Sequence, residues 1–239
     1  CSLPLSVWCA TEVMLMRNEK IISRKREGLL LITIGLLLIA AALFITAYNL
    51  YDELRAEQSA RQMVNKLDEC LTSDATPEEP TDTVGNQNPL VSDERTSIPD
   101  YVLCPNMEMP IETVNGMNFI GVLRIPALEL ELPIIREWSY PNLKIAPCRY
   151  SGSAYLNNLI ICAHNYRSHF GKLKNLCEGD IATFTDMDGN VFTYKMVERE
   201  TLLPKSIDAM ESGDWDLTLF TCTVGGQSRV TIRFELVEK

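Results

Sequence analysis

The residues of this chain best suited to chemistry are a cysteine, an arginine and a histidine near the ends of apolar segments. Cys222 closes the segment LTLFTC at residues 217–222, and Arg229 follows it by seven residues. His164 directly follows a second apolar segment, LIICA at residues 159–163. A cysteine reacts as its thiolate, so it needs a base or a cation beside it at neutral pH. The three residues together predict acyl transfer: Cys222 attacks a peptide carbonyl, Arg229 and a backbone N–H stabilise the oxyanion, and His164 moves the proton.

Each of these residues also has a plainer interpretation. A cysteine in an apolar strand is usually a packing residue, an arginine that opens a strand is usually solvated, and a histidine at a strand end usually makes a structural hydrogen bond. The chain has two histidines, and His164 is the better candidate because His169 lies in the loop-like stretch RSHFG at residues 167–171. Arg229 is preferred to Arg233 because it is nearer to Cys222, although both can share one strand face.

The strands that carry these residues must bring them together. Side chains alternate between the two faces of a strand, so Cys222 shares a face with Phe220, and His164 shares a face with Cys162. If the two strands are neighbours, Cys222 and His164 meet at one end of the sheet. The stretch VGGQS at residues 224–228 is short enough to return the chain as an adjacent antiparallel strand, which places Arg229 close to Cys222.

The second half of the chain has the pattern of many short strands with few helices, which indicates a closed β-barrel or a sandwich. The stretch DMDGN at residues 186–190 is a hairpin turn signal, and residues 171–177 are a candidate helical turn. We therefore predict a mainly β fold, a closed barrel with a few short helices. Its strands are expected at residues 119–126, 128–135, 159–163, 181–185, 191–197, 217–222 and 229–236.

An almost uninterrupted apolar run occupies residues 28–50, with no charged residue in it. It has the ~20 residues that a transmembrane helix needs. A buried core helix and a cleaved signal peptide are the alternatives, but Tyr48 near the end of the run is followed by Tyr51, Asp52 and Glu53 instead of a small-residue cleavage site. Five basic residues precede the run between positions 17 and 26, and mostly acidic ones follow it. The positive-inside rule then keeps residues 1–27 in the cytoplasm and places the rest of the chain outside the cell.

The segments around this apolar span differ in composition and pattern. Residues 1–13 have no clear pattern and could be a translation artefact, with Met14 or Met16 as the true start. Residues 51–71 predict a juxtamembrane helix whose apolar stripe (Ala60, Val64, Leu67 and Leu71) serves either a plain spacer helix or self-association. We expect residues 72–116 to be a flexible linker, since residues 72–100 are rich in Thr, Pro, Asp, Glu and Ser. The folded domain is then residues 117–239.

Composition excludes some classes of function. The net charge of −10 and the pI near 4.8 argue against nucleic-acid binding, because no basic patch dominates. The eight cysteines are scattered with no C-x-x-C pair, so a zinc site has little support. We expect mostly buried single thiols, with one or two disulfides as the alternative outside the cell.

The segments around His164, Cys222 and Arg229 resemble the signature segments of sortases, the cysteine transpeptidases of Gram-positive bacteria. TLFTC at residues 218–222 resembles their TLxTC motif, AHN at 163–165 is similar to their histidine segment, and RVTIR at 229–233 is similar to their arginine strand. GVLRIP at 121–126 with LPI at 132–134 is similar to the first strands of the family. The resemblance covers roughly residues 117–237. It implies a β-barrel of sortase type and a catalytic set of His164, Cys222 and Arg229.

The resemblance also implies a substrate and partners. Sortases recognise an LPxTG-like sorting signal, cleave after its threonine and hold the acyl chain as a thioester. An amine of a peptidoglycan precursor or of a pilin lysine then resolves it. Calcium stimulates some relatives, but the sequence has no well-defined carboxylate cluster, so we expect no cofactor and no metal. A cysteine peptidase that only hydrolyses and a catalytically silent surface scaffold remain the alternatives.

Overall fold

The computed structural model describes residues 5–73 and 98–237, and side chains within residues 28–69 and 98–237. It divides into two compact units, Cys1–Asp52 and Glu53–Lys239. The long helix α1 (Leu5–Ser73) runs through the first unit and into the second as one continuous element. It therefore includes both helices that the sequence predicted, at residues 28–50 and 51–71.

Helix α1 contains one segment that is long and apolar enough to cross a membrane, within Gly28–Glu69, and its most apolar stretch is not buried by the protein. The exposed fraction of the large leucine and isoleucine side chains on this stretch runs from 46% for Ile34 to 69% for Leu37. Such exposure costs free energy in water and none in a lipid core. This property fits a membrane anchor.

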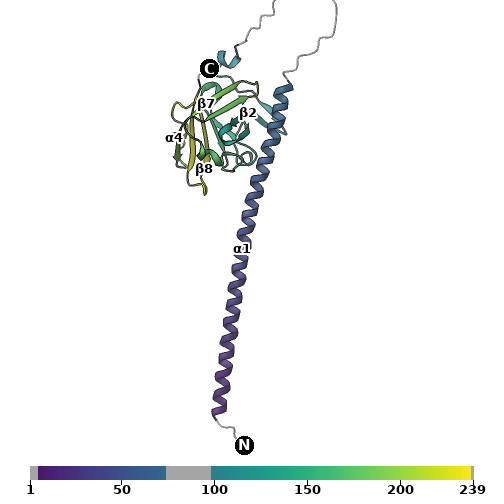
Figure 1. Ribbon diagram of the computed structural model, residues 1–239, viewed down its shortest axis with the longest axis vertical. Coiled ribbons are helices and arrows are strands. Elements are labelled where there is room, and N and C mark those ends of the chain that lie inside the picture. Colours follow the sequence, from purple (N-terminus) through teal and green to yellow (C-terminus); the bar gives the residue numbers. More distant parts are fainter. Residues whose placement is uncertain (1–4, 74–97, 238–239) are drawn as a thin grey trace, which may run out of the picture. The chain divides into compact units, whose positions relative to one another are not determined.

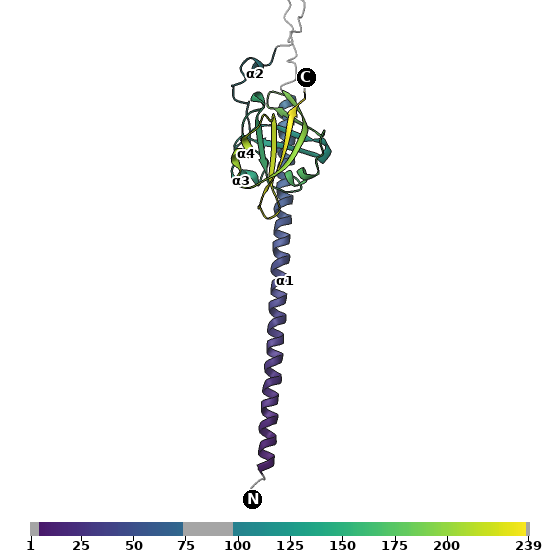
Figure 2. The same ribbon diagram turned by 90° about the vertical axis from the view of Figure 1, so that its left-hand side faces the viewer.

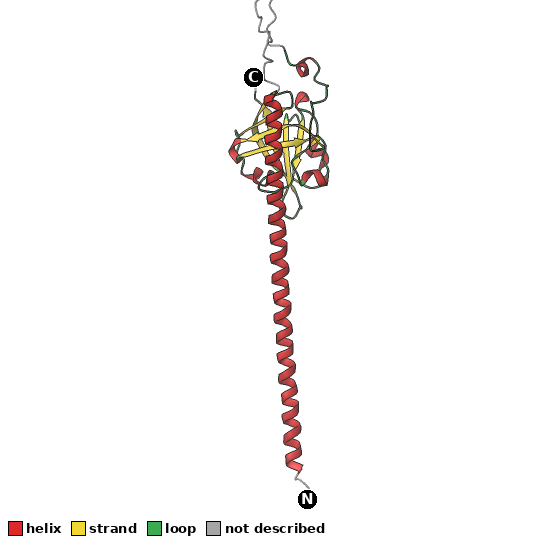
Figure 3. Cartoon of the chain, turned by 90° about the vertical axis from the view of Figure 1, so that its right-hand side faces the viewer, coloured by secondary structure: helices red, strands yellow, loops and turns green. Residues whose placement is uncertain are grey.

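The described residues of the second unit form one nine-stranded sheet, most of which closes into a barrel (Figures 1 to 3). The order is β1-β2-β3-β4-β5-β8-β9-β7-β6, and an additional β2–β6 pairing closes the ring. Strand β1 pairs with β2 alone and lies outside the ring, so the other eight strands form the barrel. Their bounds are β1 (Glu112–Val114), β2 (Met117–Ile125), β3 (Leu130–Ile135), β4 (Cys148–Ser151), β5 (Leu159–Ala163), β6 (Ile181–Asp186), β7 (Val191–Leu202), β8 (Leu217–Cys222) and β9 (Arg229–Leu236). The predicted closed β-barrel is confirmed.

Short helices lie before the first strand and between later strands (Figure 3, red). They are α2 (Asp100–Leu103), η1 (Pro126–Leu128), α3 (Tyr140–Leu143), η2 (Ala154–Leu156), η3 (Phe170–Asn175) and α4 (Ile207–Glu211). Most neighbouring strands are antiparallel, but β3–β4 and β5–β8 are parallel pairs. The β5–β8 pair matters for function, since parallel strands end at the same edge of a sheet.

Two apolar clusters stabilise this unit, and they occupy different layers. The larger one contains Ile161, Leu217, Leu219 and Ile232, which fill the barrel, together with side chains of β2, β3, β6 and β7. The smaller one contains Met63 and Leu67 of α1 with residues of β2, β4 and β5. The last turns of α1 thus cover an outer face of the barrel.

Helix α1 within the second unit is held by its apolar stripe. Ala60, Val64 and Leu67 are buried at 3%, 5% and 0% exposure, and polar contacts flank them. Asp68 accepts a hydrogen bond from Arg124 at 3.2 Å, and Glu53 accepts one from the backbone N–H of Arg167 at 2.7 Å. The chain's own barrel therefore covers the stripe, which the sequence had assigned either to a plain spacer or to self-association. The side chain of Leu71 lies outside the described residues.

Ordered structure begins earlier than residue 117, where the sequence placed the start of the domain. Residues 74–97 of the predicted linker lie outside the described residues, but residues 98–116 include α2 and β1. Tyr101 stacks on Tyr155 with ring centroids 4.7 Å apart, and Met109 is 6% exposed. Single apolar residues in this stretch each fill a site on the barrel, and such isolated anchors leave no periodic pattern in the sequence.

Candidate active site

Cys222 and His164 lie at the ends of two paired strands. Strands β5 and β8 run parallel with Ala163 opposite Thr221. Cys222 is the last residue of β8 and His164 is the first residue after β5, so the register places them at the same edge of the sheet. The hydroxyl of Thr221 donates to the carbonyl of Ala163 at 2.8 Å and ties the two strand ends together.

Arg229 lies beside Cys222 on the next strand. Strands β8 and β9 form an antiparallel hairpin in which Cys222 and Arg229 are directly opposite residues. Gly225 and Gly226 in the turn have φ angles of 84° and 72°, a region that glycine adopts without steric cost. The backbone N–H of Thr223 donates to the carbonyl of Ser228 at 2.9 Å and closes the turn. The glycine turn predicted at this position thus sets the pairing of thiol and guanidinium.

A single cavity brings the three residues together. It has a volume of about 380 Å³ and is lined by Cys222, His164 and Arg229. Its other walls are largely apolar and come from three places: the ends of β5 and β8 with Tyr150 of β4, the β3–β4 connection, and the β7–β8 connection. These residues are Cys162, Ala163, Phe220, Thr221 and Tyr150; Trp138, Tyr140 and Leu143; and Leu203, Pro204, Ser206, Ile207 and Met210.

The charge on Arg229 is available to a ligand of this cavity. Its guanidinium donates to the carbonyl of Ser228 at 3.4 Å and forms no ion pair among the described residues. A cation that no carboxylate neutralises, in a partly buried apolar cavity, favours a thiolate or an oxyanion placed next to it.

Burial distinguishes Cys222 from the other thiols of this region. Cys148 and Cys162 are buried opposite each other on β4 and β5, and burial raises the pKa of Cys148 to about 12. Burial also raises the pKa of Cys162, and the nearby thiols of Cys148 and Cys222 raise it further. Both thiols stay protonated at neutral pH, so half-buried Cys222 is the nucleophile candidate of the cavity. Of the five cysteines with described side chains, Cys104 and Cys177 are exposed, so the prediction of mostly buried thiols holds only in part.

The two histidines have different environments. His164 is half-buried and lines the cavity, whereas His169 is fully buried and does not. Burial, and then the charge of His164, lower the pKa of His169 to about 4, and the Ile145 backbone opposes this weakly. Neither ring nitrogen of His169 makes a hydrogen bond of normal geometry within the described residues. His169 is therefore neutral at physiological pH, and His164 is the histidine that can exchange protons with a ligand.

The loop that carries both histidines is tightly closed. The backbone N–H of Phe170 donates to the carbonyl of His164 at 3.2 Å, and that of His169 donates to Tyr166 at 3.0 Å. A Cβ atom at Gly171 would lie 2.4 Å from the carbonyl oxygen of Asn165, so only glycine permits this close approach. The backbone of His164 is held by these contacts.

A row of aromatic rings extends from the surface to β8, the strand that ends at Cys222. Tyr150 packs edge-on against Phe220 with centroids 5.3 Å apart, and Trp138 stacks on Tyr150 at 6.0 Å. Tyr140 is 74% exposed and touches Trp138. The sequence analysis missed this wall and the one formed by residues 203–210. The stretch EWSYPN at residues 137–142, with two aromatic residues in a polar connection, was the available signal.

Comparison with known proteins identifies the barrel. Residues 123–237 match the family model described as the sortase domain. Residues 123–237 are therefore a sortase domain. The match covers every barrel strand after the start of β2 and includes His164, Cys222 and Arg229.

Solved sortases share the fold. Sortase C of Streptococcus pneumoniae aligns with a TM-score of 0.50 and 18% identity, over 74% of this chain and 97% of that one. Sortase A of Corynebacterium diphtheriae (TM-score 0.48, 21% identity) aligns over 52% of this chain and 62% of its own length, which is less than two thirds. The sortase D5 transpeptidase of Clostridium perfringens (0.46, 21% identity) aligns over 53% and 83%. A comparison with curated proteins finds no match.

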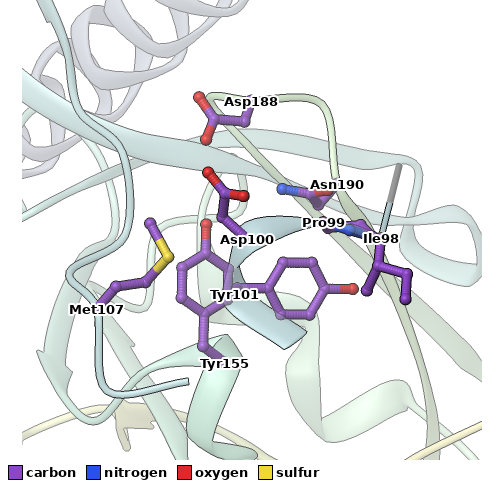
Figure 4. A pocket seen from close by; sticks show the side chains of 8 residues that line it. All are labelled: Ile98, Pro99, Asp100, Tyr101, Met107, Tyr155, Asp188 and Asn190. Carbon is purple, nitrogen blue, oxygen red and sulfur yellow. The ribbon is translucent and has the colours of Figure 1, made fainter. Parts of the chain in front are cut away.

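A second cavity of about 250 Å³ lies against α2 (Figure 4). The carboxylates of Asp100 and Asp188 lie on one side of it and the rings of Tyr101 and Tyr155 on the other. Burial, then Asp186 and Asp100, raise the pKa of Asp188. No cysteine or histidine is among the described residues that line this cavity. Among the residues with described side chains, no group of three or more His, Cys, Asp and Glu residues could hold a metal ion.

Proposed function

We propose that this chain is a membrane-anchored cysteine transpeptidase that cleaves an LPxTG-like sorting signal and transfers the acyl part to an amine. The observation that carries the proposal is the shared cavity of Cys222, His164 and Arg229. A nucleophile, a proton carrier and a fixed cation at one cavity are the groups that acyl transfer requires.

The first half of the reaction forms a thioester. The Cys222 thiolate attacks the carbonyl carbon of the scissile peptide bond, and the carbonyl electron pair moves to oxygen as an oxyanion. Arg229, directly opposite Cys222 on β9, stabilises this charge. His164 donates a proton to the leaving amine as the C–N bond breaks, and the acyl group remains on the sulfur of Cys222.

The second half regenerates the enzyme. An incoming amine attacks the thioester carbonyl while His164, now neutral, accepts its proton. The C–S bond breaks, the thiolate returns to the side of Arg229, and a new amide bond joins the acyl group to the acceptor. Water in place of the amine gives hydrolysis. The acceptors proposed are a peptidoglycan precursor or a pilin lysine, on the strength of the family.

The shape of the cavity supports an extended peptide with apolar side chains as the substrate. Ile207 and Met210 contribute apolar surface on one side, and Tyr150 and Phe220 contribute it on another. Apolar walls with few polar groups bind leucine and proline side chains well, and the reacting groups lie beside them. This arrangement suits the leucine and proline of an LPxTG-like signal.

The membrane arrangement is part of the proposal. The exposed apolar stretch of α1 would cross the bilayer through residues 28–50. Basic residues before it and acidic ones after it would keep the N-terminus in the cytoplasm and the barrel outside the cell. Sorting signals of surface proteins and cell-wall acceptors are present on that side.

The test uses the full chain in non-ionic detergent micelles with a fluorogenic LPxTG peptide. We expect cleavage by the unaltered chain and none by Cys222→Ala, whereas Cys104→Ala, which removes an exposed thiol, retains activity. Arg229→Met is expected to lower kcat by about 10²–10³-fold, the typical loss for one oxyanion donor. Full activity of Cys222→Ala would refute the proposal.

An amine acceptor separates the alternatives. A transpeptidase gives a ligated product when an oligoglycine or a lysine peptide is present, whereas a cysteine peptidase gives only the hydrolysed acid. A catalytically silent scaffold gives neither product, and its Cys222 does not react with a thiol-directed substrate mimic.

A further inference from the structure

Arg233 is a buried cation that the proposed chemistry does not use. It lies on β9 four residues after Arg229 and is 1% exposed. Arg229, Thr231 and Arg233 share one face of the strand because side chains alternate. Arg229 lines the active-site cavity, but Arg233 does not, so the two arginines of this face have different tasks.

The guanidinium of Arg233 makes four hydrogen bonds. Nε donates to Oε1 of Glu200 on β7 at 2.7 Å, and this contact is also an ion pair. One terminal nitrogen donates to the carbonyl of Met210 at 2.8 Å and to the hydroxyl of Thr218 at 2.9 Å. The other donates to the carbonyl of Ala209 at 2.6 Å. Two strands of the barrel and one short helix thus meet at a single side chain.

The two carbonyls belong to the end of helix α4. The last carbonyls of a helix have no partner within the helix, and a cation there also interacts favourably with its dipole. Helix α4 has five residues, and an isolated helix of that length is unstable in water. Its order therefore depends on contacts such as those of Arg233 and the packing of Met210, whose sulfur accepts from Thr231 at 3.8 Å.

Helix α4 and the residues before it form one wall of the active-site cavity. Leu203, Pro204, Ser206, Ile207 and Met210 all line it. Leu203 and Ile207 are 69% and 51% exposed, so little else in the protein fixes their positions. The wall is held on the barrel through the contacts of the Ala209 and Met210 carbonyls.

We propose that Arg233 is a positioning residue that sets the width of the substrate groove by clamping the C-terminal end of α4 to β9. Through this clamp it determines how tightly the sorting peptide is held. The role in peptide binding rests on the proposed function, whereas the clamp itself does not. Arg233 touches no reacting atom, so its loss acts on substrate binding and leaves the reactivity of the thiol unchanged.

Two substitutions test the clamp in the full chain in detergent micelles. Arg233→Met keeps an unbranched, flexible side chain and removes every donor. Arg233→Lys keeps the charge beside Glu200, but one ammonium cannot reproduce the planar set of donors. Arg61→Met is the matched control, because Arg61 is an exposed arginine that pairs with Glu57 on the same helix at 2.7 Å.

Hydrogen exchange measures the clamp without any substrate. The backbone N–H groups of Met210 and Ser212 donate to Ser206 and Asp208, at 3.1 and 2.7 Å. In both Arg233 variants we expect their exchange to be faster by at least about tenfold, because the loss of one net hydrogen bond corresponds to about that factor. Arg61→Met leaves their exchange unchanged. Unchanged exchange in folded Arg233→Lys would overturn the proposal. If Arg233→Met does not fold, the result for Arg233→Lys alone decides.

Two further measurements connect the clamp to the groove. KM for the peptide is expected to rise on the order of tenfold with kcat within about twofold, since only positioning is lost. The rate at which a bulky aromatic maleimide labels Cys222, divided by the rate for iodoacetamide, is expected to rise at least about threefold as the wall opens. A fall in kcat at unchanged KM, or an unchanged labelling ratio, would overturn the role in the groove. If the unaltered chain cleaves no peptide, the proposed function fails, and exchange with the labelling ratio still decides this proposal.

Discussion

Leu67 provides a direct test of the packing between the end of α1 and the barrel. Its side chain has 0% exposure and belongs to the outer apolar cluster, with Phe119 and Val122 of β2 and Cys148 of β4. Replacing a fully buried leucine by alanine costs about 2–5 kcal/mol, from lost transfer free energy and from the cavity that remains. For Leu67→Ala we expect a loss of about 3 kcal/mol in the free energy of unfolding.

The assay is urea unfolding of the full chain in non-ionic micelles, followed by tryptophan fluorescence. Trp138 and Trp215 belong to the barrel unit, and urea leaves a micelle-embedded span largely folded. Leu54→Ala is the matched control on the same helix, because Leu54 is 50% exposed. Its change should remain within about 0.5 kcal/mol.

Equal effects of the two substitutions, both below about 0.5 kcal/mol, would refute the packing of residues 53–69 on the barrel. The same result would return the apolar stripe to one of the roles that the sequence allowed, a spacer or a surface for self-association. A chain that begins at residue 72 would lack this helix and expose the outer cluster, so we expect it to be less stable than the full chain by a similar or larger amount.

Two more predictions follow from the buried titratable groups. The pKa of His169 is about 4 in the folded state and about 6.5 when unfolded, so the unfolded chain binds more protons between these values. Stability should therefore fall by about 3 kcal/mol as the pH drops from 6.5 to 4, and urea titrations of His169→Phe should lack this slope. Mass spectrometry after iodoacetamide treatment at pH 7.5 should find Cys104, Cys177 and Cys222 alkylated, and Cys148 and Cys162 unmodified because burial keeps them protonated. Labelling of Cys162 as fast as that of Cys222 would contradict the burial of the Cys162 thiol.

The sequence predicted the elements whose patterns are long or whose turn signals are distinct. Apolar segments identified the strands that end at Ala163 and Cys222, and the glycine turn at residues 224–228 predicted the pairing with Arg229. The parallel pairing of these two strands, β5 and β8, is a long-range contact that the sequence supported only as a condition. Cys222 and Arg229 are only seven residues apart, so their pairing was easier to predict than a contact between distant segments.

The parts that the sequence did not reveal depend on short elements and single side chains. Strand β4 has four residues and β1 has three, too few for alternation to be recognised. Helix α4 owes its position to Arg233, which the sequence treated only as a rival of Arg229. His169 was assigned to a loop, which is correct for its backbone, but burial by distant residues makes it a neutral core group.

The central claim is that Cys222 carries the acyl group of a cleaved sorting signal. It is tested most directly by intact-mass and peptide-mapping spectrometry of the full chain, incubated with an LPxTG peptide and stopped in acid before an amine is added. The account predicts an adduct of the mass of the N-terminal peptide fragment, attached to Cys222, removed by hydroxylamine or an amine acceptor and absent from Cys222→Ala. The contradicting result is cleavage of the peptide with no adduct trapped at any time, at a rate that Cys222→Ala does not lower.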